Sequence, residues 1–560
     1  MKASTNTGRP SSSVKAQGRW CELTRHFGGP VVVSARRLSQ YLPQTVLVFA
    51  AVLISLPHLA STRIDDIDSA HHIMDGIFFR DFIIDLPRSL RHPIAYTFSY
   101  YEQYPALGFV FWPPLFPAIE ALFFLFGQID VRVARVCVLA FGLLLALIIH
   151  ALLRRSFSRA TAVLTVLLIL STPIIAAFYQ QIMLEIPALA VTFLSIFFYK
   201  RIVTHASLRW ADLLLFSFTA AAAVYTKQTV VFIFPAFFLD AYVNHRDIFR
   251  NRRCWLSVLL LILLLTPLAL YTVTIGKANL HQSIGSDKSF VLNSAAPPDR
   301  WSATGWLYYP THLPRLLNPI LILLAIGGVG YSLLNPVFFR ANALWLGWIA
   351  SWYLMFSYFL NKQDRYALFW LPSLIILAVA FLVALSRRYS CRSWIIYVIL
   401  IISGIPALAG LSQTQTDGFD GLDTIFKTVT RYPPAGNILY IGEHHQMIIP
   451  FVRQYDVTRR IYTLRGSDLL SPTSDILAVC KDYRVRLIVT EGFDVPFRHE
   501  TESLLARGRL VLLGTFPVTT RAGRIPMTVF HYPGPIASVQ KRIPIGSGKI
   551  GQSALRGAEL

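Results

Sequence analysis

Apolar runs of about 17–22 residues recur along the chain between Thr45 and Leu411, and they constrain the fold more than any other feature. A helix of this length crosses the roughly 30 Å hydrocarbon layer of a membrane. Only 15% of the residues are charged and 54% are hydrophobic, whereas about 25% are charged in an average soluble domain. The sequence therefore predicts a polytopic α-helical membrane protein.

About eleven spans are expected, and together they define a membrane domain over residues 42–411. Residues 1–41 begin no hydrophobic leader, so the first span is expected to be an anchor that is not cleaved. The spans are predicted at 42–60, 131–153, 160–178, 185–200, 210–225, 228–243, 255–275, 316–334, 343–360, 366–385 and 394–411.

The distribution of charge predicts the orientation of these spans. If the basic tail 1–41 is cytoplasmic, the inner segments carry 21 basic and 2 acidic residues, whereas the first outer loop, 61–130, carries 4 and 9. This is the positive-inside pattern, so the net charge of +22 requires no nucleic-acid partner. We expect a multi-pass protein of the cell (inner) membrane with its N-terminus inside.

The segment 112–126 inside the first outer loop is also apolar enough for a short span. Counting it as a span would reverse every later loop and place the arginine-rich ones outside. We therefore expect a helix that lies in the outer interface or dips into it; a true span is the alternative.

After the last span, residues 412–535 are expected to form a small extracytoplasmic α/β domain. Strand-like runs at 437–442, 460–464, 487–490, 510–516 and 527–532 alternate with helical stretches near 444–455, 473–483 and 498–507, which favours a partly parallel sheet. The sequence has no glycine-rich nucleotide fingerprint and no Walker lysine, so nucleotide binding has no support. Residues 536–560 are rich in Gly, Ser and basic residues and are expected to be a disordered tail.

Ionisable residues near the ends of spans are candidates for function, because a charge at membrane depth costs about 2.5–3.5 kcal/mol. The richest cluster follows the first span and contains Asp65, Asp66, Asp68 and His72. If this stretch is helical, Asp65, Asp68 and His72 lie at i, i+3 and i+7 on one face. Crowded carboxylates suit a general base. The alternatives are a solvated acidic loop and, more weakly, a divalent cation site.

Other charged residues are expected at the same outer boundary. Glu185 begins the fourth span, Lys227 occupies a tight turn, and Arg135 lies near the outer start of the second span. Arg365 and Tyr366 begin the tenth span. Each cation alone could simply reach the lipid headgroups, but acids and fixed cations that converge could bind a phosphate and activate a hydroxyl.

Several short motifs follow one another in a characteristic order across about residues 40–390. They are the acidic motif, Pro113-Pro114-Leu115, Phe126-Gly127 with Ala134-Arg135, Arg154-Arg155-Ser-Phe, Ser171-Thr-Pro173, Glu185, Thr226-Lys227 and Arg365-Tyr366. In this order they resemble the GT-C class of membrane glycosyltransferases, most closely the protein O-mannosyltransferase-like family and the lipid A aminoarabinose transferases.

This resemblance implies inverting transfer of a sugar from a polyprenyl phosphate to a hydroxyl of a lipid, glycan or protein. A first-loop aspartate would be the base. Asp68 fits the family spacing best and Asp65 second, since Asp65-Asp66 mimics the usual Asp-Glu pair. The resemblance places Lys227 and Arg365, with Tyr366 and Arg135, at the donor phosphate. Asp66, His72 and Glu185 would support the site, although the family usually has Asp where Glu185 stands.

Two other classes of protein are alternatives to an enzyme. A flippase or transporter of lipid-linked sugars would place its charges near the bilayer midplane, between structural repeats, whereas here they lie towards one face and no repeat is visible. A non-catalytic scaffold that presents the tail would leave the acids and cations without a purpose. The glycosyltransferase is the favoured interpretation.

Overall fold

The computed structural model describes residues 35–543, apart from 110, 206–207, 285–299, 412–417, 430–435, 472–473, 493–496 and 521–522. Most of the basic tail expected over 1–41, and most of the disordered tail expected over 536–560, lies outside the described residues. The chain forms two compact units, Met1–Val46 and Leu47–Leu560. The described part of the first unit is helical, and all contacts below lie within the second unit.

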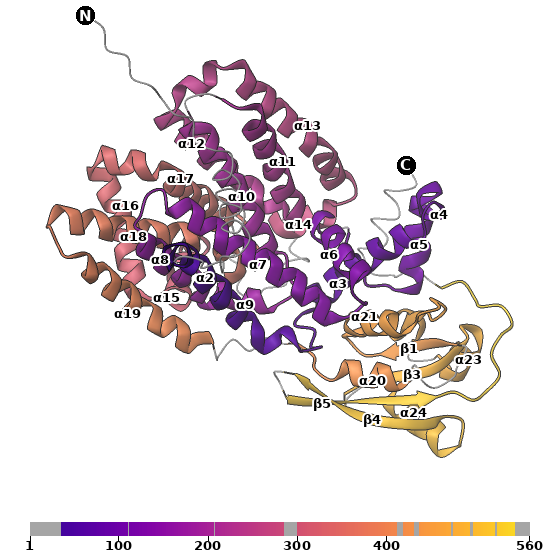
Figure 1. Ribbon diagram of the computed structural model, residues 1–560. Coiled ribbons are helices and arrows are strands. Elements are labelled where there is room, and N and C mark those ends of the chain that lie inside the picture. The colour runs from indigo at the N-terminus through magenta and orange to yellow at the C-terminus, as the bar shows by residue number, and fades with distance from the viewer. Residues whose placement is uncertain are drawn as a thin grey trace, which may run out of the picture. The chain divides into compact units, whose positions relative to one another are not determined.

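Helices make up most of the second unit (Figure 1). Up to the last predicted span, their bounds are α2 (Ala35–Leu59), α3 (Ile67–Ile84), α4 (Arg88–Arg91), α5 (Pro93–Gln103), α6 (Leu115–Phe126), α7 (Val131–Leu153), α8 (Arg159–Ser171), α9 (Pro173–Gln180), α10 (Glu185–Thr204), α11 (Trp210–Thr226), α12 (Phe234–Asn244), α13 (Arg252–Thr274), α14 (Lys277–Ile284), α15 (Ala303–Leu316), α16 (Pro319–Leu334), α17 (Pro336–Tyr358), α18 (Leu371–Arg388) and α19 (Ser393–Leu411). Among the described residues, the 3-10 helices are η1 (Gln228–Ile233), η2 (Arg246–Arg250) and η4 (Asp364–Phe369).

Among the described residues, five helices are long and apolar enough to cross a membrane, and each coincides with a predicted span. A sixth forms if α8 and α9 count together, although they are bent by 69°. Pro173 explains the bend, because it lacks an N–H and disfavours helical backbone at Thr172. Several other predicted spans are shorter apolar helices, so the total of eleven stays a prediction. The five are Tyr41–Leu59, Val131–Leu153, Glu185–Thr204, Arg252–Thr274 and Leu371–Arg388.

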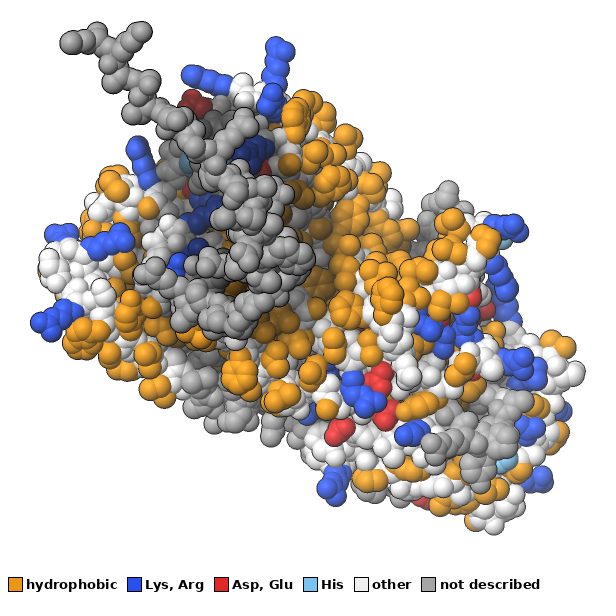
Figure 2. Space-filling model, viewed as in Figure 1, with side chains coloured by type: hydrophobic (Ala, Val, Ile, Leu, Met, Phe, Trp, Pro, Cys, Tyr) orange, Lys and Arg blue, Asp and Glu red, His pale blue; other side chains and the backbone are white. Residues whose placement is uncertain are grey.

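Large hydrophobic side chains cover the outside of several of these helices. On α13, Leu259, Ile262, Leu263 and Leu270 are each more than half exposed, and Figure 2 shows broad hydrophobic areas of this kind. Soluble monomers rarely expose contiguous apolar surface on this scale. The exposed leucines and isoleucines therefore fit a lipid-facing surface.

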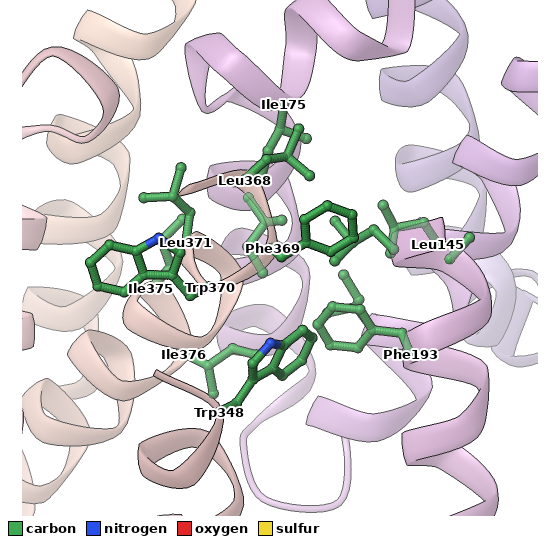
Figure 3. Packing of buried hydrophobic residues seen from close by; sticks show 14 of the residues in the cluster. Leu145, Ile175, Phe193, Trp348, Leu368, Phe369, Trp370, Leu371, Ile375 and Ile376 are labelled. Atoms are coloured by element: carbon green, nitrogen blue, oxygen red, sulfur yellow. The ribbon is translucent and has the colours of Figure 1, made fainter. Parts of the chain in front are cut away.

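The interior of the helical part is densely aromatic, and it holds η4 in place. Leu368 and Phe369 of η4 are fully buried and pack with Phe193 of α10 and Trp348 of α17 (Figure 3). The Phe369 ring also stacks on Trp352 at 5.0 Å between centroids. This packing fixes the short 3-10 helix that carries Arg365.

The predicted interfacial segment 112–126 contains helix α6, only twelve residues long. It packs against α3, the helix that follows the acidic segment. The two helices bury apolar side chains such as Ile73, Ile77 and Phe124. These side chains belong to one hydrophobic core with residues of the C-terminal part such as Phe426 and Ile448.

The C-terminal part contains a five-stranded sheet of order β2-β1-β3-β5-β4 (Figure 1). β1 pairs in parallel with β2 and β3, whereas β5 is antiparallel to β3 and β4, so the sheet is mixed. Each predicted strand and helical stretch has a counterpart. The elements are α20 (Leu422–Val429), β1 (Asn437–Ile441), α21 (His445–Tyr455), β2 (Thr463–Arg465), α22 (Gly466–Leu469), α23 (Ile476–Asp482), β3 (Val485–Glu491), α24 (Arg498–Ala506), β4 (Val511–Thr520) and β5 (Gly523–His531).

A buried ion pair joins helix α21 of the C-terminal part to helix α3. Arg453 of α21 donates to both carboxylate oxygens of Asp81 on α3, with distances of 2.8 and 2.9 Å. The Tyr100 hydroxyl and the Arg80 guanidinium also donate to Asp81, at 2.9 and 2.8 Å. Since Asp81 is fully buried, these bonds compensate for the lost hydration of its charge.

Candidate functional site

The acidic segment 63–68 connects the first span to α3. Asp66 has extended backbone and the helix begins at Ile67. Asp68 and His72 therefore lie on one face of α3, whereas Asp65 lies before the helix. The expected alignment of all three on a single helical face is wrong, because the helix starts two residues after Asp65.

Asp65 is instead held by Arg135 of α7. The two side chains are buried, with 3.0 Å between Arg135 Nη2 and Asp65 Oδ2. The same guanidinium donates to the carbonyls of Ser61, Arg63 and Gln180. Arg135 thus ties the acidic segment to α7 and α9, and its nitrogens are engaged in these contacts.

Arg365 of η4 reaches the acidic segment from a point 297 residues further along the chain. Its Nη1 lies 2.9 Å from Oδ2 of Asp68. The next residue, Tyr366, stacks its ring on Phe356 at 4.7 Å between centroids, and its hydroxyl interacts with the Arg365 guanidinium. The buried aromatic side chains that follow Arg365 therefore fix the turn that carries it.

Lys227 lies in a one-residue break between α11 and η1, where its backbone is extended. Its Nζ is 2.6 Å from Oε1 of Glu185, the first residue of α10. The ammonium group also lies 5.7 Å from the centre of the Phe369 ring. Like Arg365, Lys227 is thus carried by a short irregular segment between apolar helices.

These two ion pairs belong to one cluster. The charges of Asp68 and Arg365 both act on Lys227, and the charges of Asp68, Glu185 and Lys227 act on His72. The cluster therefore joins side chains from α3, α10, η4 and the end of α11. A mixed group of two carboxylates, two cations and an imidazole can exchange protons and bind an anion.

Asp66 and Asp68 differ in their protonation behaviour. Burial acts against the charge of Asp68, but the Arg365 guanidinium outweighs it and lowers the pKa of that carboxyl below its usual value. Asp66 remains partly exposed; loss of water around its carboxyl group, together with the Asp68 carboxylate, raises its pKa to about 6. Burial lowers the pKa of His72 to about 3. Asp68 is therefore ionised and His72 neutral at pH 7.

An aromatic side chain that the sequence analysis did not single out covers His72. The Trp112 ring lies edge-on to His72 at 4.6 Å between centroids and also contacts His71 at 5.7 Å. Phe116 of α6 approaches His72 from another side at 6.2 Å. Residues of the segment 112–126 therefore pack around His72 on α3.

Two further acids, Asp75 of α3 and Glu120 of α6, were also missed. Both are fully buried. Asp75 accepts a hydrogen bond from Gly108 N at 2.8 Å, whereas neither Glu120 oxygen has a hydrogen-bond partner among the described residues. The sequence held a signal for each of them. Asp75 lies seven residues after Asp68, on the same helical face, and Glu120 is the single acid in the apolar segment 112–126. Over the described part of the chain, no three His, Cys, Asp or Glu side chains are grouped closely enough to hold a metal ion.

Comparisons with known proteins agree with the resemblance noted in the sequence. Residues 112–271 match the family described as dolichyl-phosphate-mannose-protein mannosyltransferase. No curated protein sequence matches the chain at a significant level.

The fold is similar to that of ArnT from Cupriavidus metallidurans. The apo structure of ArnT has a TM-score of 0.53 and 13% sequence identity, over 89% of this chain and 98% of ArnT. The structure of ArnT bound to undecaprenyl phosphate has a TM-score of 0.52 and 14% identity, over 89% and 99% of the two chains. The comparisons thus show that residues 112–271 resemble this mannosyltransferase family and that the chain has a fold similar to that of ArnT.

Proposed function

We propose that the protein transfers a sugar, with inversion, from a polyprenyl phosphate to a hydroxyl group of a lipid, glycan or protein at the outer face of the membrane. The observation that carries this proposal is the cluster in which Arg365 meets Asp68 at 2.9 Å and Lys227 meets Glu185 at 2.6 Å. A transferase of this kind needs a carboxylate base beside cations for the leaving phosphate. The structure of ArnT with undecaprenyl phosphate supports the choice of donor.

In the proposed reaction, Asp68 takes the proton of the acceptor hydroxyl while that oxygen forms a bond to the anomeric carbon. The bond from the anomeric carbon to the phosphate oxygen breaks, and polyprenyl phosphate leaves with the electron pair. Arg365 and Lys227 balance its charge, and cations fixed in a site poor in water stabilise such a transition state. Tyr366 supports Arg365, and Arg135 with Asp65 holds the acidic segment.

Donor binding tests the proposal first. In lipid nanodiscs, Lys227→Met and Arg365→Gln should each weaken binding of undecaprenyl phosphate about 10-fold or more, since a hydrogen bond to a charged group contributes about 1.5–3 kcal/mol. Lys200→Met is the matched control, because Lys200 makes a similar pair with Asp240 at 2.9 Å outside the cluster.

The same preparation tests transfer. Incubated with labelled undecaprenyl-phosphate hexoses and pentoses and a cell-envelope fraction, the wild-type protein should move label to an acceptor, and both variants should do so more slowly. If Lys227→Met and Arg365→Gln bind undecaprenyl phosphate as tightly as the wild type and Lys200→Met do, Lys227 and Arg365 only anchor helices. Binding without transfer from any donor in the panel would argue against an enzyme.

We also infer that the N-terminus is cytoplasmic and that the C-terminal sheet faces outwards. The native Cys480, a natural choice of reporter, is fully buried, so a new one is required. In right-side-out membrane vesicles, Val457→Cys, at a position 83% exposed, should react with an impermeant thiol reagent. The exposed Cys391, beside the basic Arg387-Arg388 segment, should react only after permeabilisation. The reverse pattern would overturn this orientation and the site's placement with it.

A further inference from the structure

Residues Gly418–Asp420, which follow the last predicted span, run between the acidic segment and the C-terminal sheet. Phe419 and Ile64 form an antiparallel bridge in which Ile64 N donates to Phe419 O at 3.1 Å and Phe419 N donates to Ile64 O at 2.8 Å. The next residue, Asp420, makes a second such bridge with Thr519 of β4, with both bonds at 3.0 Å. We call Gly418–Asp420 the strap.

Gly418 brings the strap against the backbone of the acidic segment. A Cβ atom at this position would lie 2.7 Å from Asp65 Cα and 2.6 Å from Arg63 Nε, and it would also overlap the carbonyl oxygen of Ile64. Real Cβ contacts are not this short, so any side chain here would displace the acidic segment. Glycine is required by this close approach.

The ring of Phe419 anchors the strap to the sheet. Phe419 is only 5% exposed, and its ring lies 4.7 Å from that of His444. His444 in turn contacts Glu491 at the end of β3, with 2.5 Å between Nδ1 and Oε1. Glu491 also accepts a hydrogen bond from the Tyr440 hydroxyl of β1 at 2.6 Å. The anchor therefore rests on the carboxyl ends of two central strands.

Asp65 is thus held from two directions, by Arg135 of α7 and by the strap. Asp66 follows in the same short segment and Asp68 lies in the first turn of α3, so a shift of the backbone at Asp65 is passed on to the start of the helix that carries Asp68. A misplacement of about 1 Å in a catalytic group can cost about 100-fold in rate. The donor cations Lys227 and Arg365 are carried by other segments, so they would keep their places.

We propose that Gly418 and Phe419 are positioning residues through which the C-terminal sheet sets the place of the catalytic carboxylate. The effect on catalysis rests on the proposed function. The mechanical part, which is that the strap holds the acidic segment in place, does not. The C-terminal sheet would then take part in the reaction by holding the catalytic carboxylate in place.

The mechanical part is tested by hydrogen exchange on the full chain in nanodiscs. In Gly418→Ala, amide exchange in peptides covering residues 61–70 should become about 10-fold faster or more. Phe419→Ala, which keeps the backbone bridge but removes the ring from His444, should give a smaller increase in the same peptides. Gly330→Ala is the matched control, because a Cβ there meets nothing within 4 Å. Unchanged exchange over 61–70 in both strap variants would overturn the proposal.

The catalytic part is tested with the donor and acceptor found in the transfer assay. Gly418→Ala should lower kcat about 10-fold or more and leave the affinity for undecaprenyl phosphate unchanged, a division that general unfolding would not produce. Equal loss of donor affinity and kcat would overturn the positioning role. Faster exchange over 61–70 in a protein whose wild type transfers no sugar would reject the proposed function and leave the strap itself supported.

Discussion

Replacing Asp68 with asparagine is expected to lower turnover about 100-fold or more. Asparagine keeps the shape of the side chain but cannot accept a proton, and a general base contributes about 10²–10⁴ in rate. Because Asp68 is also the partner of Arg365 at 2.9 Å, its loss frees that guanidinium for phosphate. Undecaprenyl phosphate should therefore bind the variant as tightly as the wild type, or more tightly.

The neighbouring aspartates are the controls for this experiment. Asp66→Asn should lose much less activity than Asp68→Asn. Asp65→Asn should show an intermediate loss, because it weakens the contact with Arg135 that holds the segment. A dead Asp65→Asn beside an active Asp68→Asn would move the base by three residues. Full activity in all three variants would remove the acidic segment from catalysis.

The pH dependence separates Asp68 from Asp66. The Arg365 guanidinium keeps the pKa of Asp68 below its usual value, so with Asp68 as base kcat/KM should change little between pH 7 and pH 5. Asp66 has a pKa raised to about 6, so with Asp66 as base kcat/KM should fall as pH drops through about 6. An acid limb near pH 6 that disappears in Asp66→Asn would transfer the role to Asp66.

Replacing Arg453 with methionine is expected to give the largest loss of stability. Methionine roughly fills the space but leaves the fully buried Asp81 without its two-point partner. Breaking a buried ion pair from one side costs about 3–5 kcal/mol, and the hydrogen bonds from Arg80 and Tyr100 that remain compensate for only part of the charge of Asp81. Thermal unfolding in detergent should therefore begin several degrees lower, with the contact between α21 and α3 failing first.

Arg132→Gln provides the matched control. Arg132 makes an ion pair of similar length with Asp130, 2.6 Å, but its side chain is 52% exposed, and exposed pairs contribute about 0–1 kcal/mol. If Arg453→Met and Arg132→Gln unfold at the same temperature, the hydrogen bonds between Arg453 and Asp81 contribute no measurable stability to the contact between α21 and α3. Asp81→Asn should lie between them, since the amide oxygen still accepts hydrogen bonds from Tyr100 and Arg453.

The sequence predicted local features of this fold far better than the contacts between them. Span lengths and alternating strands are local patterns, so α7, α10 and the strand β3 fall close to where they were expected. The break at Thr172–Pro173 and the helix start after Asp66 were also readable, from a proline and from an aspartate at a helix N-cap. An N-cap at Asp66 places Asp65 before the helix, so Asp65 cannot share a helical face with Asp68 and His72 as expected.

The partners within the site could not be predicted in the same way. Asp68 and Arg365 are 297 residues apart, and no periodicity specifies which cation meets which acid. Arg135 and Lys227 looked equivalent in sequence, yet one is engaged by backbone carbonyls and the other by Glu185. Only tertiary packing decides such choices, and the same holds for the contact between Gly418 and Asp65.

The pairing of each donor cation with a carboxylate has a consequence for the end of the catalytic cycle. A phosphate monoester left on two bare cations in a site poor in water would dissociate slowly, and product release limits many enzymes. Here Asp68 lies within ion-pair distance of Arg365, and Glu185 within ion-pair distance of Lys227. Each carboxylate can therefore pair with its cation again when the phosphate leaves. If Lys227 and Arg365 bind the leaving phosphate as proposed, the two carboxylates would compete with the spent lipid carrier for these cations, which lowers its affinity and speeds its release from the site.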